Sequence, residues 1–539
     1  MKRINSLNLV LIILLMSLFV SCKDKNAETK NIDEVSETIA YSEEELYRPN
    51  FHFTPKKAWM NDPNGMFYYN GYYHLYFQHY PDANVWGPMH WGHAISTDMV
   101  SWQEMPIAIY PDEKGYIFSG SAVVDENNTS GFGKDGGKPI IAMFTYHDMD
   151  ADKAGETNFQ SQAIAYSLDE GQTFTKYSKN PVIKNPGIKD FRDPKIVWDS
   201  IHEKWIMVLA AGKKIMFYSS FNLKDWTLES DFGEDIGAHG GVWECPDFFP
   251  MVIQGTDEIK WVLFVSIYPG GPNGGSATQY FVGDFDGKQF TIDSSFEKDL
   301  NNTEHKSIWI DYGRDNYAGV TWANIPDTDG RKLFMGWMSN WNYAPEVPTE
   351  TWRSAMTVAR SLELQKAASS YRLSFQPVKE LNSYRGTKYK KDSILIKGET
   401  KIFDSKLIDL SSTEINFKIS EPNNIGFTFK LTNKQGDTLA FGFNNSDKNF
   451  FIDRRKSGKT DFSEKFANKV TTAKRTSTKN NLSGTILLDK TSIELFYDNG
   501  ETVMTEIFFP NAPYDKISIE SPKQEFILDN IEVHKLNFN

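Results

Sequence analysis

The sequence predicts an all-β protein: a five-bladed β-propeller followed by a C-terminal β-sandwich. Three observations lead to this fold class. Short apolar runs bounded by Gly, Pro, Asn and Asp dominate the chain after residue 50, which is typical of strands joined by tight turns. Similar runs recur through the first part of the chain, as the blades of a propeller do. The last part alternates apolar and polar residues with period two, which favours strands with one buried face.

The composition sets the size of the protein and excludes one class of partner. With 539 residues, of which 40% are hydrophobic and 14% aromatic, the chain is long enough for one large and one medium domain. Its net charge of −13 argues against nucleic acid as a partner, because binding a phosphate backbone takes a surplus of Lys and Arg. An acidic surface is compatible with neutral partners such as sugars.

The N-terminus has the features of an export signal. Lys2 and Arg3 precede the apolar run LNLVLIILLMSLFV, which is too short to span a bilayer comfortably, so residues 1–21 are predicted to be a signal peptide. Cys22 follows this run and resembles the lipidation site of a bacterial lipoprotein, although Phe19 stands where an aliphatic residue is usual. The alternative is a plain secretory signal with an incidental cysteine.

Residues 22–48 are predicted to be the lipidated cysteine and a flexible tether, because they are polar, acidic and almost free of large aliphatic side chains. The only other cysteine is Cys245, so no intramolecular disulfide is expected once Cys22 carries lipid. We expect a bacterial lipoprotein anchored in the outer membrane by its lipid alone, facing the periplasm or the cell surface. The absence of a dense acidic run directly after Cys22 favours the periplasmic side.

Residues 49–362 are predicted to form the propeller. Five apolar runs begin between about 55 and 70 residues apart, and most are followed by a second strand that ends in a polar turn and an aromatic residue. The runs begin at Tyr72, Pro139, Lys204, Lys260 and Arg331. Five units of this length, each with room for about four strands, predict five blades.

A polar segment precedes each of these runs, where the innermost strand of a blade would lie. The segments begin NDPNG, FSGS, FRDP, ECPD and DYGRD. Because inner strands line the central channel of a propeller, we expect their polar residues to meet at its mouth. These residues are Asp62, Ser119, Asp193, Glu244 and Asp311.

The stretch WMNDPNG around Asp62 also has the composition of a tight turn, since Pro fixes φ and Asn, Asp and Gly suit turn positions. Taken alone, it favours a structural role for Asp62. Its recurrence in register with four other polar segments favours a functional one.

The remainder of the chain is predicted to support the propeller. Residues 363–385 are rich in Lys, Gln and Ser and are predicted to be a linker. Residues 386–539 are predicted to form the β-sandwich, because strands such as TEINFKIS alternate and DNG at Asp498–Gly500 indicates a hairpin.

A cluster of carboxylates among aromatic residues suits either a metal ion or the cleavage of a glycosidic bond. The metal is the weaker interpretation, and no metal ligand is predicted. His90 and His93 would face opposite sides of a strand, and DMDAD at Asp148–Asp152 is interpreted as a solvated loop rather than a calcium site.

Glycoside cleavage needs one carboxylate at the anomeric carbon and one carboxylic acid that protonates the leaving oxygen. Burial and neighbouring charge keep one of two close carboxyl groups protonated, and Arg192 can compensate the negative charge.

The motifs WMNDPNG, FSGS, FRDP and WECPD, in this order and spacing, resemble those of glycoside hydrolase family 32, the β-fructosidases. The resemblance implies a propeller with a C-terminal sandwich and a retaining mechanism that needs no metal or other cofactor. It implies that Asp62 is the nucleophile, Glu244 the general acid/base and Asp193 the stabiliser of the transition state. It also implies sugar contacts from Asn61, Gln78, Trp86, Phe118, Ser119, Arg192 and Trp337.

Four residues of the predicted propeller also have a purely structural interpretation. Trp86 and Trp337 could be core aromatics, and Cys245 is interpreted as a packed thiol. Asp311 either supports the cluster by hydrogen bonding or simply ends a strand.

WMNDPNG, FSGS and GWMSNWNYA most resemble the exo-acting bacterial levanases and inulinases of the family. The expected function is therefore hydrolysis of terminal, non-reducing β-D-fructofuranosyl residues in fructans or fructo-oligosaccharides, with sucrose as a further candidate substrate. Three alternatives stay open: an endo-levanase, a fructosyltransferase, and a non-catalytic fructan-binding lipoprotein. The last would keep the aromatic residues but lose a carboxylate, whereas all three carboxylates are present.

Overall fold

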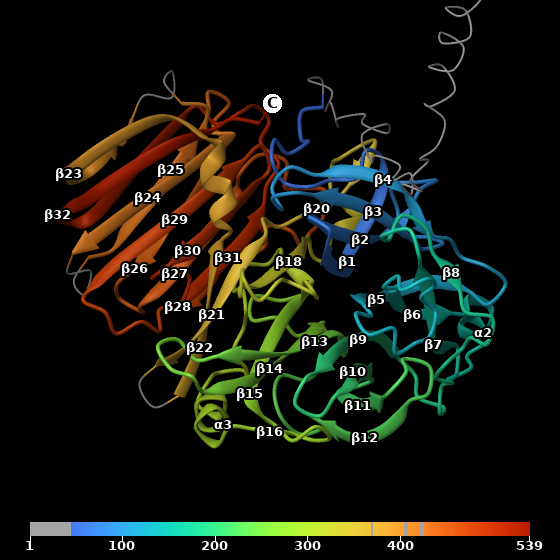
Figure 1. Cartoon of the computed structure of the whole chain (residues 1–539). Coiled ribbons are helices and arrows are strands. Elements are labelled where there is room, and N and C mark those ends of the chain that lie inside the picture. The colour runs from blue at the N-terminus through green and yellow to red at the C-terminus, as the bar shows by residue number, and fades with distance from the viewer. Residues whose placement is uncertain (1–44, 368–369, 404–407, 421–424, 539) are drawn as a thin grey trace, which may run out of the picture. The chain divides into compact units, whose positions relative to one another are not determined.

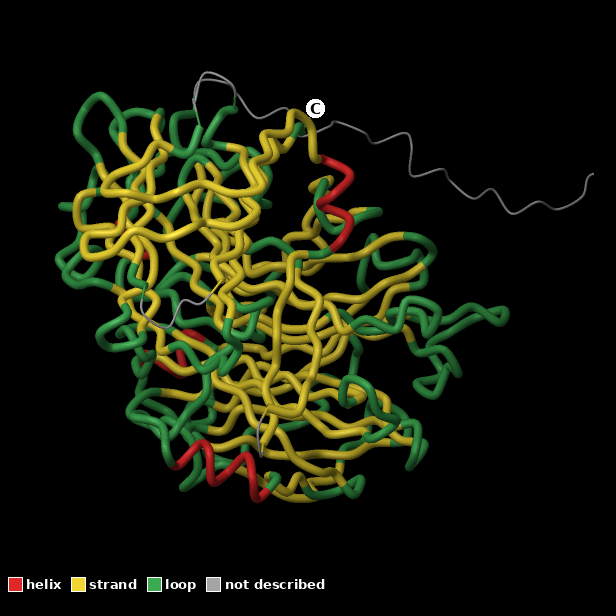
Figure 2. Tube along the Cα trace, turned by 90° about the vertical axis from the view of Figure 1, so that its left-hand side faces the viewer, coloured by secondary structure: helices red, strands yellow, loops and turns green. Residues whose placement is uncertain are grey.

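The computed structural model describes residues 45–538 except 368–369, 404–407 and 421–424. The predicted signal peptide, Cys22 and nearly all of the predicted tether lie outside the described residues. The described residues belong to one compact unit. They fold into six sheets with few helices, which confirms the all-β class (Figure 1, Figure 2). No described helix is long and apolar enough to cross a membrane.

Five of the sheets form the predicted propeller. Each begins with an inner strand, and these are β1 (Ala58–Tyr69), β5 (Tyr116–Val124), β9 (Phe191–Asp199), β13 (Val242–Val252) and β17 (Tyr317–Thr321). The inner strands are neighbours in this order, and β17 packs against β1 to close the ring.

Each blade continues outward through antiparallel strands, and the five apolar runs of the sequence are the second strands, β2, β6, β10, β14 and β18. Blade by blade, the outer strands are β2 (Tyr72–Tyr80), β3 (His90–Ser96) and β4 (Gln103–Ile109); β6 (Ile140–His147), β7 (Gln160–Ser167) and β8 (Thr175–Lys176); β10 (Lys204–Ala211), β11 (Lys214–Ser220) and β12 (Thr227–Phe232); β14 (Ile259–Tyr268), β15 (Ala277–Phe285) and β16 (Phe290–Ile292); β18 (Lys332–Met338), β21 (Arg360–Ala367) and β22 (Ser370–Pro377).

Two short strands complete the propeller. β20 (Ala355–Met356) lies beside β18, and β19 (Trp352–Arg353) pairs in parallel with β1. Because β19 comes from the end of the propeller sequence, this pairing ties the last blade to the first.

The predicted linker over residues 363–385 is wrong. Its first part forms most of β21 and β22, the outer hairpin of the fifth blade, in which Leu364 faces Leu373 and both are buried. Of the polar residues that suggested a linker, Gln365, Lys366 and Gln376 are exposed or half-buried, whereas Ser370 and Ser374 are buried within the hairpin. The fifth blade therefore reaches Pro377, and a 3₁₀ helix, η3 (Lys379–Tyr384), follows it.

The sixth sheet is the C-terminal β-sandwich; nine of its ten strands form one continuous hydrogen-bonded path, and the tenth, β23 (Arg385–Lys401), pairs with the last strand, β32 (Lys516–Leu536), off this path. The last strand, β32, is long enough to join two layers. Its first part pairs with β25 (Phe427–Thr432) and its second part with β24 (Ser412–Ser420), and the apolar side chains of the two layers meet in one core. The strands are β23 (Arg385–Lys401), β24 (Ser412–Ser420), β25 (Phe427–Thr432), β26 (Thr438–Asn444), β27 (Asn449–Lys456), β28 (Thr471–Lys474), β29 (Asn481–Asp489), β30 (Ser492–Tyr497), β31 (Thr502–Ile507) and β32 (Lys516–Leu536).

The other described helices are short connections. They are α2 (Met149–Lys153), α3 (Ser294–Asn301) and the 3₁₀ helix η2 (Ala344–Glu346). Asp148 and Asp293 cap the first two by accepting hydrogen bonds from backbone N–H groups of the first turn.

Every inner strand has an irregular register, which in the first four blades lies at the polar segment and in the fifth lies just after it. The shifts lie at Met60–Pro63 in β1, Ile117–Gly120 in β5, Arg192–Lys195 in β9, Glu244–Asp247 in β13 and Tyr317–Val320 in β17. A bulge breaks the alternation of a strand and turns a side chain toward a new direction, which is why bulges are frequent beside active sites. In four of the five blades, the polar segment that recurs in the sequence is thus the site of a bulge.

The stretch WMNDPNG is accordingly not a turn. It lies inside β1, where Pro63 and Gly65 belong to an irregular strand rather than to a chain reversal. Gly65 has φ +51°, and an added Cβ would lie 2.7 Å from the ring of Trp91. The residues that suit turns are therefore used here to bend a strand.

Candidate active site

The bulged segments of the inner strands open into a cavity of about 520 Å³. The structure brings together there all the residues expected at the propeller site except Trp337 and Asp311. Those in the cavity are Asn61, Asp62, Gln78, Trp86, Phe118, Ser119, Arg192, Asp193 and Glu244. Blades one to four each contribute through their inner strand, as expected from the sequence.

Asp62 is held from two sides. Ser119 Oγ donates to its Oδ2 at 2.6 Å, and Asn61 Nδ2 donates to its Oδ1 at 3.0 Å. The amide of Asn61 is oriented in turn by Trp59, whose Nε1 donates to Asn61 Oδ1 at 2.7 Å. Burial raises the pKa of Asp62, and the hydrogen bonds from Ser119 and Asn61 oppose that rise.

Asp193 lies beside Asp62, and Cys245 joins the two. The backbone N–H of Cys245 donates to Asp193 Oδ2 at 2.9 Å, and its Sγ lies 3.5 Å from Oδ2 of each aspartate. Burial raises the pKa of Asp193 to about 7; Arg192 opposes this, whereas Glu244 and Asp62 add to it. Burial and the same carboxylates raise the pKa of the Cys245 thiol well above its ordinary value. Cys245 is thus a neutral, packed thiol.

Glu244 is held by a cation and by a phenol. Arg192 Nη2 donates to Glu244 Oε1 at 2.8 Å, and the hydroxyl of Tyr317 donates to Oε2. Arg192 also pairs with Asp190 at 2.6 Å, and its Nε lies 4.0 Å from Asp193 Oδ2. One largely buried guanidinium therefore faces three carboxylates, which keep it charged and hold it in place.

Trp337 does not contribute to the wall of the cavity, and this prediction is wrong. Its side chain is fully buried and packs against Trp59, Tyr317 and Trp341. Trp341, the second tryptophan of the same GWMSNW motif, lines the cavity instead. β18 ends at Met338, so Trp337 still points into the blade while Trp341 lies beyond the strand.

Asp311 is not in the cavity either. It is buried behind it, where it accepts hydrogen bonds from Thr505, Arg360 and Asn316. The inner strand of the fifth blade begins only at Tyr317, so the register expected from DYGRD was six residues too early. Tyr317 is the residue that the inner strand of this blade sends to the site.

The rim contains further residues that the sequence did not single out. His147, at the end of β6, stacks on Phe118 with ring centroids 4.2 Å apart and lies 3.2 Å from Gln160. Its Nε2 is also 3.2 Å from Asp152. Asp152 belongs to α2, so DMDAD is a capped helical turn at the cavity rather than a solvated loop. In the sequence, the only feature that sets His147 apart is its position at the end of the second apolar run.

The arrangement is suited to acid–base and nucleophilic chemistry on a neutral, hydroxyl-rich ligand. Three carboxyl groups from three blades share a buried space, where their mutual repulsion favours retention of a proton near neutral pH. Trp86, Phe118 and Trp341 provide aromatic surface around them. Among residues that the structure describes, no group of three or more His, Cys, Asp or Glu side chains is arranged to hold a metal ion.

Comparison with known families gives two matches that together span nearly all of the described chain. The model of the glycosyl hydrolases family 32 N-terminal domain matches residues 52–377, and that of the glycosyl hydrolases family 32 C terminal matches residues 380–535. The boundary between them follows β22, in agreement with the fifth blade as the structure has it.

Individual proteins are similar over most of their length. A levanase of Bacillus subtilis (strain 168) is 44% identical over 495 residues, which are 92% of this chain and 71% of that levanase. The crystal structure of exo-inulinase from Aspergillus awamori superposes with a TM-score of 0.83 at 34% identity, covering 92% of this chain and 99% of that one. A fructofuranosidase variant from Schwanniomyces occidentalis, complexed with fructosylnystose, superposes with a TM-score of 0.80 at 34% identity, covering 93% and 100%.

Proposed function

The chain belongs to glycosyl hydrolase family 32, and we propose that it is an exo-acting β-fructosidase that releases terminal, non-reducing β-D-fructofuranosyl residues from fructans. The observation that carries the proposal is one cavity in which Asp62, held by Ser119 and Asn61, lies with Asp193 and Glu244. The names of its relatives, levanase, exo-inulinase and fructofuranosidase, support fructose polymers as the substrate class.

In the first step the carboxylate of Asp62 attacks the anomeric carbon of the terminal fructose. The bond from that carbon to the linking oxygen breaks, and Glu244 gives its proton to this oxygen, so that the shortened fructan leaves with a hydroxyl group. The fructosyl unit is now covalently bound to Asp62. Ser119 and Asn61 support this step because they stabilise the ionised form of the nucleophile before the attack.

In the second step Glu244, now a carboxylate, takes a proton from a water molecule. The oxygen of that water attacks the anomeric carbon, the bond to Asp62 breaks, and fructose leaves with its configuration retained. Asp193 interacts with the hydroxyl groups of the sugar and with the positive charge that develops on the ring in both transition states. Arg192 keeps Asp193 and Glu244 in place throughout.

The proposal is tested by incubating the protein separately with levan, inulin and sucrose and resolving the products by chromatography. Release of fructose alone supports exo-hydrolysis, and oligosaccharides shorter than the polymer would indicate an endo-levanase. Products longer than the substrate would indicate a fructosyltransferase. No product from any of the three would overturn the enzymatic function, with a fructan-binding lipoprotein as the remaining alternative.

The membrane anchor is a separate proposal that rests on the sequence. Cys22 follows a signal-like apolar run and precedes a polar stretch, which supports lipid attachment at this residue. Metabolic labelling with a fatty acid should mark the protein and should fail for Cys22→Ala. A labelled Cys22→Ala variant would overturn the assignment of the site.

A further inference from the structure

A short segment, Asp311–Asn316, lies against the edge of the β-sandwich and leads directly into the inner strand of the fifth blade. Its backbone pairs with the edge of β31: Tyr312 N donates to Val503 O at 2.8 Å, and Asp315 N donates to Thr505 O at 3.1 Å. The segment thus extends the sandwich as a strand would, immediately before the propeller strand β17 begins.

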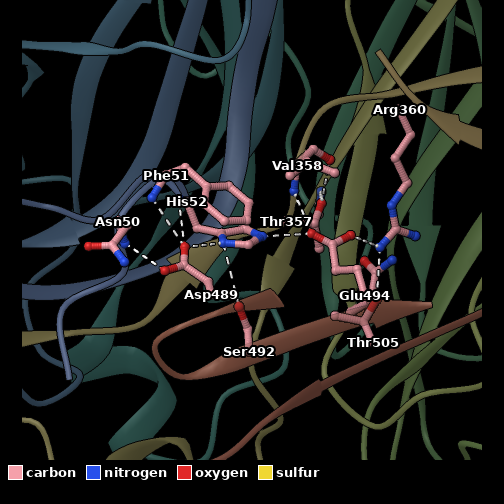
Figure 3. A network of polar contacts seen from close by, with 12 residues as sticks. Asn50, Phe51, His52, Thr357, Val358, Arg360, Asp489, Ser492, Glu494 and Thr505 are labelled. Atoms are coloured by element: carbon pink, nitrogen blue, oxygen red, sulfur yellow. Dashed lines mark hydrogen bonds and ion pairs between the residues drawn. The ribbon is translucent and has the colours of Figure 1, made fainter. Parts of the chain in front are cut away.

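Side chains fix the start of this segment. Oδ2 of Asp311 accepts from Thr505 Oγ1 at 2.6 Å, from Arg360 Nη1 at 3.0 Å and from Asn316 Nδ2 at 3.1 Å, while its Oδ1 accepts from Thr505 N at 2.9 Å. All four residues are buried. Arg360 also contacts Glu494 of β30 and Thr505 (Figure 3). The carboxylate of Asp311 therefore joins Thr505 of the sandwich strand β31 to Arg360 of the propeller strand β21 and to Asn316, and Arg360 extends the network to Glu494 of β30.

The end of the segment is fixed separately. Asp315 accepts from the hydroxyl of Tyr343 at 2.6 Å, from Arg454 Nη1 at 2.6 Å and from the backbone N–H of Ile507 at 3.0 Å. The backbone leaves no room for movement toward the sandwich, because a Cβ added at Gly313 would lie 2.1 Å from backbone atoms of Thr505.

The residue that follows the Asp311–Asn316 segment is Tyr317, whose hydroxyl donates to Glu244 Oε2. Tyr317 is itself buried, so its ring follows the position of its backbone. We propose that the β-sandwich, through Thr505 and Asp311, positions Tyr317 against Glu244 and thereby controls the proton of the acid/base. This inference rests on the proposed function and makes Thr505 a positioning residue that touches neither substrate nor reacting atoms.

The direction in which the pH profile of kcat/KM should shift follows from the hydrogen bond between Tyr317 and Glu244. A donor to a carboxylate favours the ionised form, and the hydroxyl of Tyr317 is such a donor to Glu244 Oε2, a contact that Thr505→Val is expected to weaken. The basic limb of the pH profile of kcat/KM should then move upward. The other charged or titratable groups around Glu244 and Tyr317 are Asp62 on β1, Arg192 and Asp193 on β9 and Cys245 on β13.

The test is a double-mutant cycle between Thr505→Val and Tyr317→Phe, read on fructose release from a fructan across pH. Thr505→Val removes one hydroxyl at nearly constant volume. In the wild-type background we expect it to lower kcat/KM about fivefold, the scale of one lost hydrogen bond, and to move the basic limb upward. In the Tyr317→Phe background it should change neither quantity further. Thr505→Ser, which keeps the hydroxyl, should behave as the wild type.

The matched control is Thr491→Val. Thr491 is also a buried threonine of the sandwich, but its hydroxyl donates to Tyr47 O, away from the Asp311–Asn316 segment. It should leave the pH profile unchanged even if it lowers the melting temperature. If Thr505→Val does not fold, Asn316→Ser breaks the same connection from the propeller side and replaces it in the cycle.

An active wild type in which the two substitutions act additively would overturn the inference and leave the proposed function standing. The inference would also be wrong if Thr491→Val moved the basic limb as far as Thr505→Val does. A wild type that releases no fructose would contradict both.

Discussion

Ser119 donates its hydroxyl proton to Oδ2 of Asp62 across 2.6 Å, and the two residues come from the inner strands of neighbouring blades. Burial in the cavity raises the pKa of Asp62, and this hydrogen bond opposes the rise. The contact between the first and second blades therefore helps to keep the proposed nucleophile ionised.

Ser119→Ala should move the acid limb of the pH profile of kcat/KM upward. The hydroxyl stabilises only the carboxylate form of Asp62, so its loss raises the pKa of Asp62 and protonates the nucleophile at higher pH. A hydrogen bond to a charged group contributes about 1.5–3 kcal/mol, which corresponds to a shift of about one to two pH units. Ser121→Ala is the control, since its hydroxyl donates to Pro194 O instead. An unchanged acid limb in Ser119→Ala would contradict this role.

Trp341→Ala should raise KM for fructans about tenfold and change kcat less, because it removes aromatic surface that lines the cavity but touches none of the three carboxylates. Trp337→Phe should leave KM near the wild-type value, since Trp337 lies behind the wall and is fully buried. Steady-state kinetics on both variants decide between the two tryptophans. The reverse order of effects would restore Trp337 as the sugar contact.

The protein should lose stability between about pH 6.5 and 9 through His52, which lies between Asp489 and Glu494 at the junction of propeller and sandwich (Figure 3). Burial alone would lower the pKa of His52, but hydrogen bonds to these two carboxylates raise it to about 9. Because the folded pKa lies above the ordinary value of 6.5, this contribution is complete below pH 6.5 and is lost as the pH rises through 9.

Melting temperatures measured across this range should fall more steeply for the wild type than for His52→Gln. His74→Gln is the matched control, since burial lowers the pKa of His74 to about 3, which is outside the window. Equal slopes for the wild type and His52→Gln would show that His52 is not charged in the folded protein.

The sequence predicted the parts of the fold that repeat. The five apolar runs are the second strands of five blades, and the polar segments before four of them converge on one cavity. This worked because a propeller applies the same geometry to each unit, so that equal positions in the repeat reach equal positions in space.

The errors lie where the repeat is broken or where composition is ambiguous. The fifth unit carries the sandwich-facing segment Asp311–Asn316 before its inner strand, which displaced the expected residue from Tyr317 to Asp311. Trp337 and Trp341 occur in one motif, and only the end of β18 at Met338 decides which one faces the cavity. The polar residues of β21 and β22 suggested a linker, although they lie in a hairpin whose facing residues Leu364 and Leu373 are buried.

Trapping the covalent intermediate would show directly whether Asp62 is the nucleophile of a retaining β-fructosidase. The Glu244→Ala variant is mixed with a β-D-fructofuranoside that carries a good leaving group, so that the first step proceeds without an acid while the second lacks its base. The reaction is quenched rapidly in acid, and the peptic peptides are examined by mass spectrometry. We expect one fructosyl unit on the peptide that contains Asp62. Fructosyl on the peptide that contains Asp193, or turnover of this substrate with no labelled peptide, would contradict this role of Asp62.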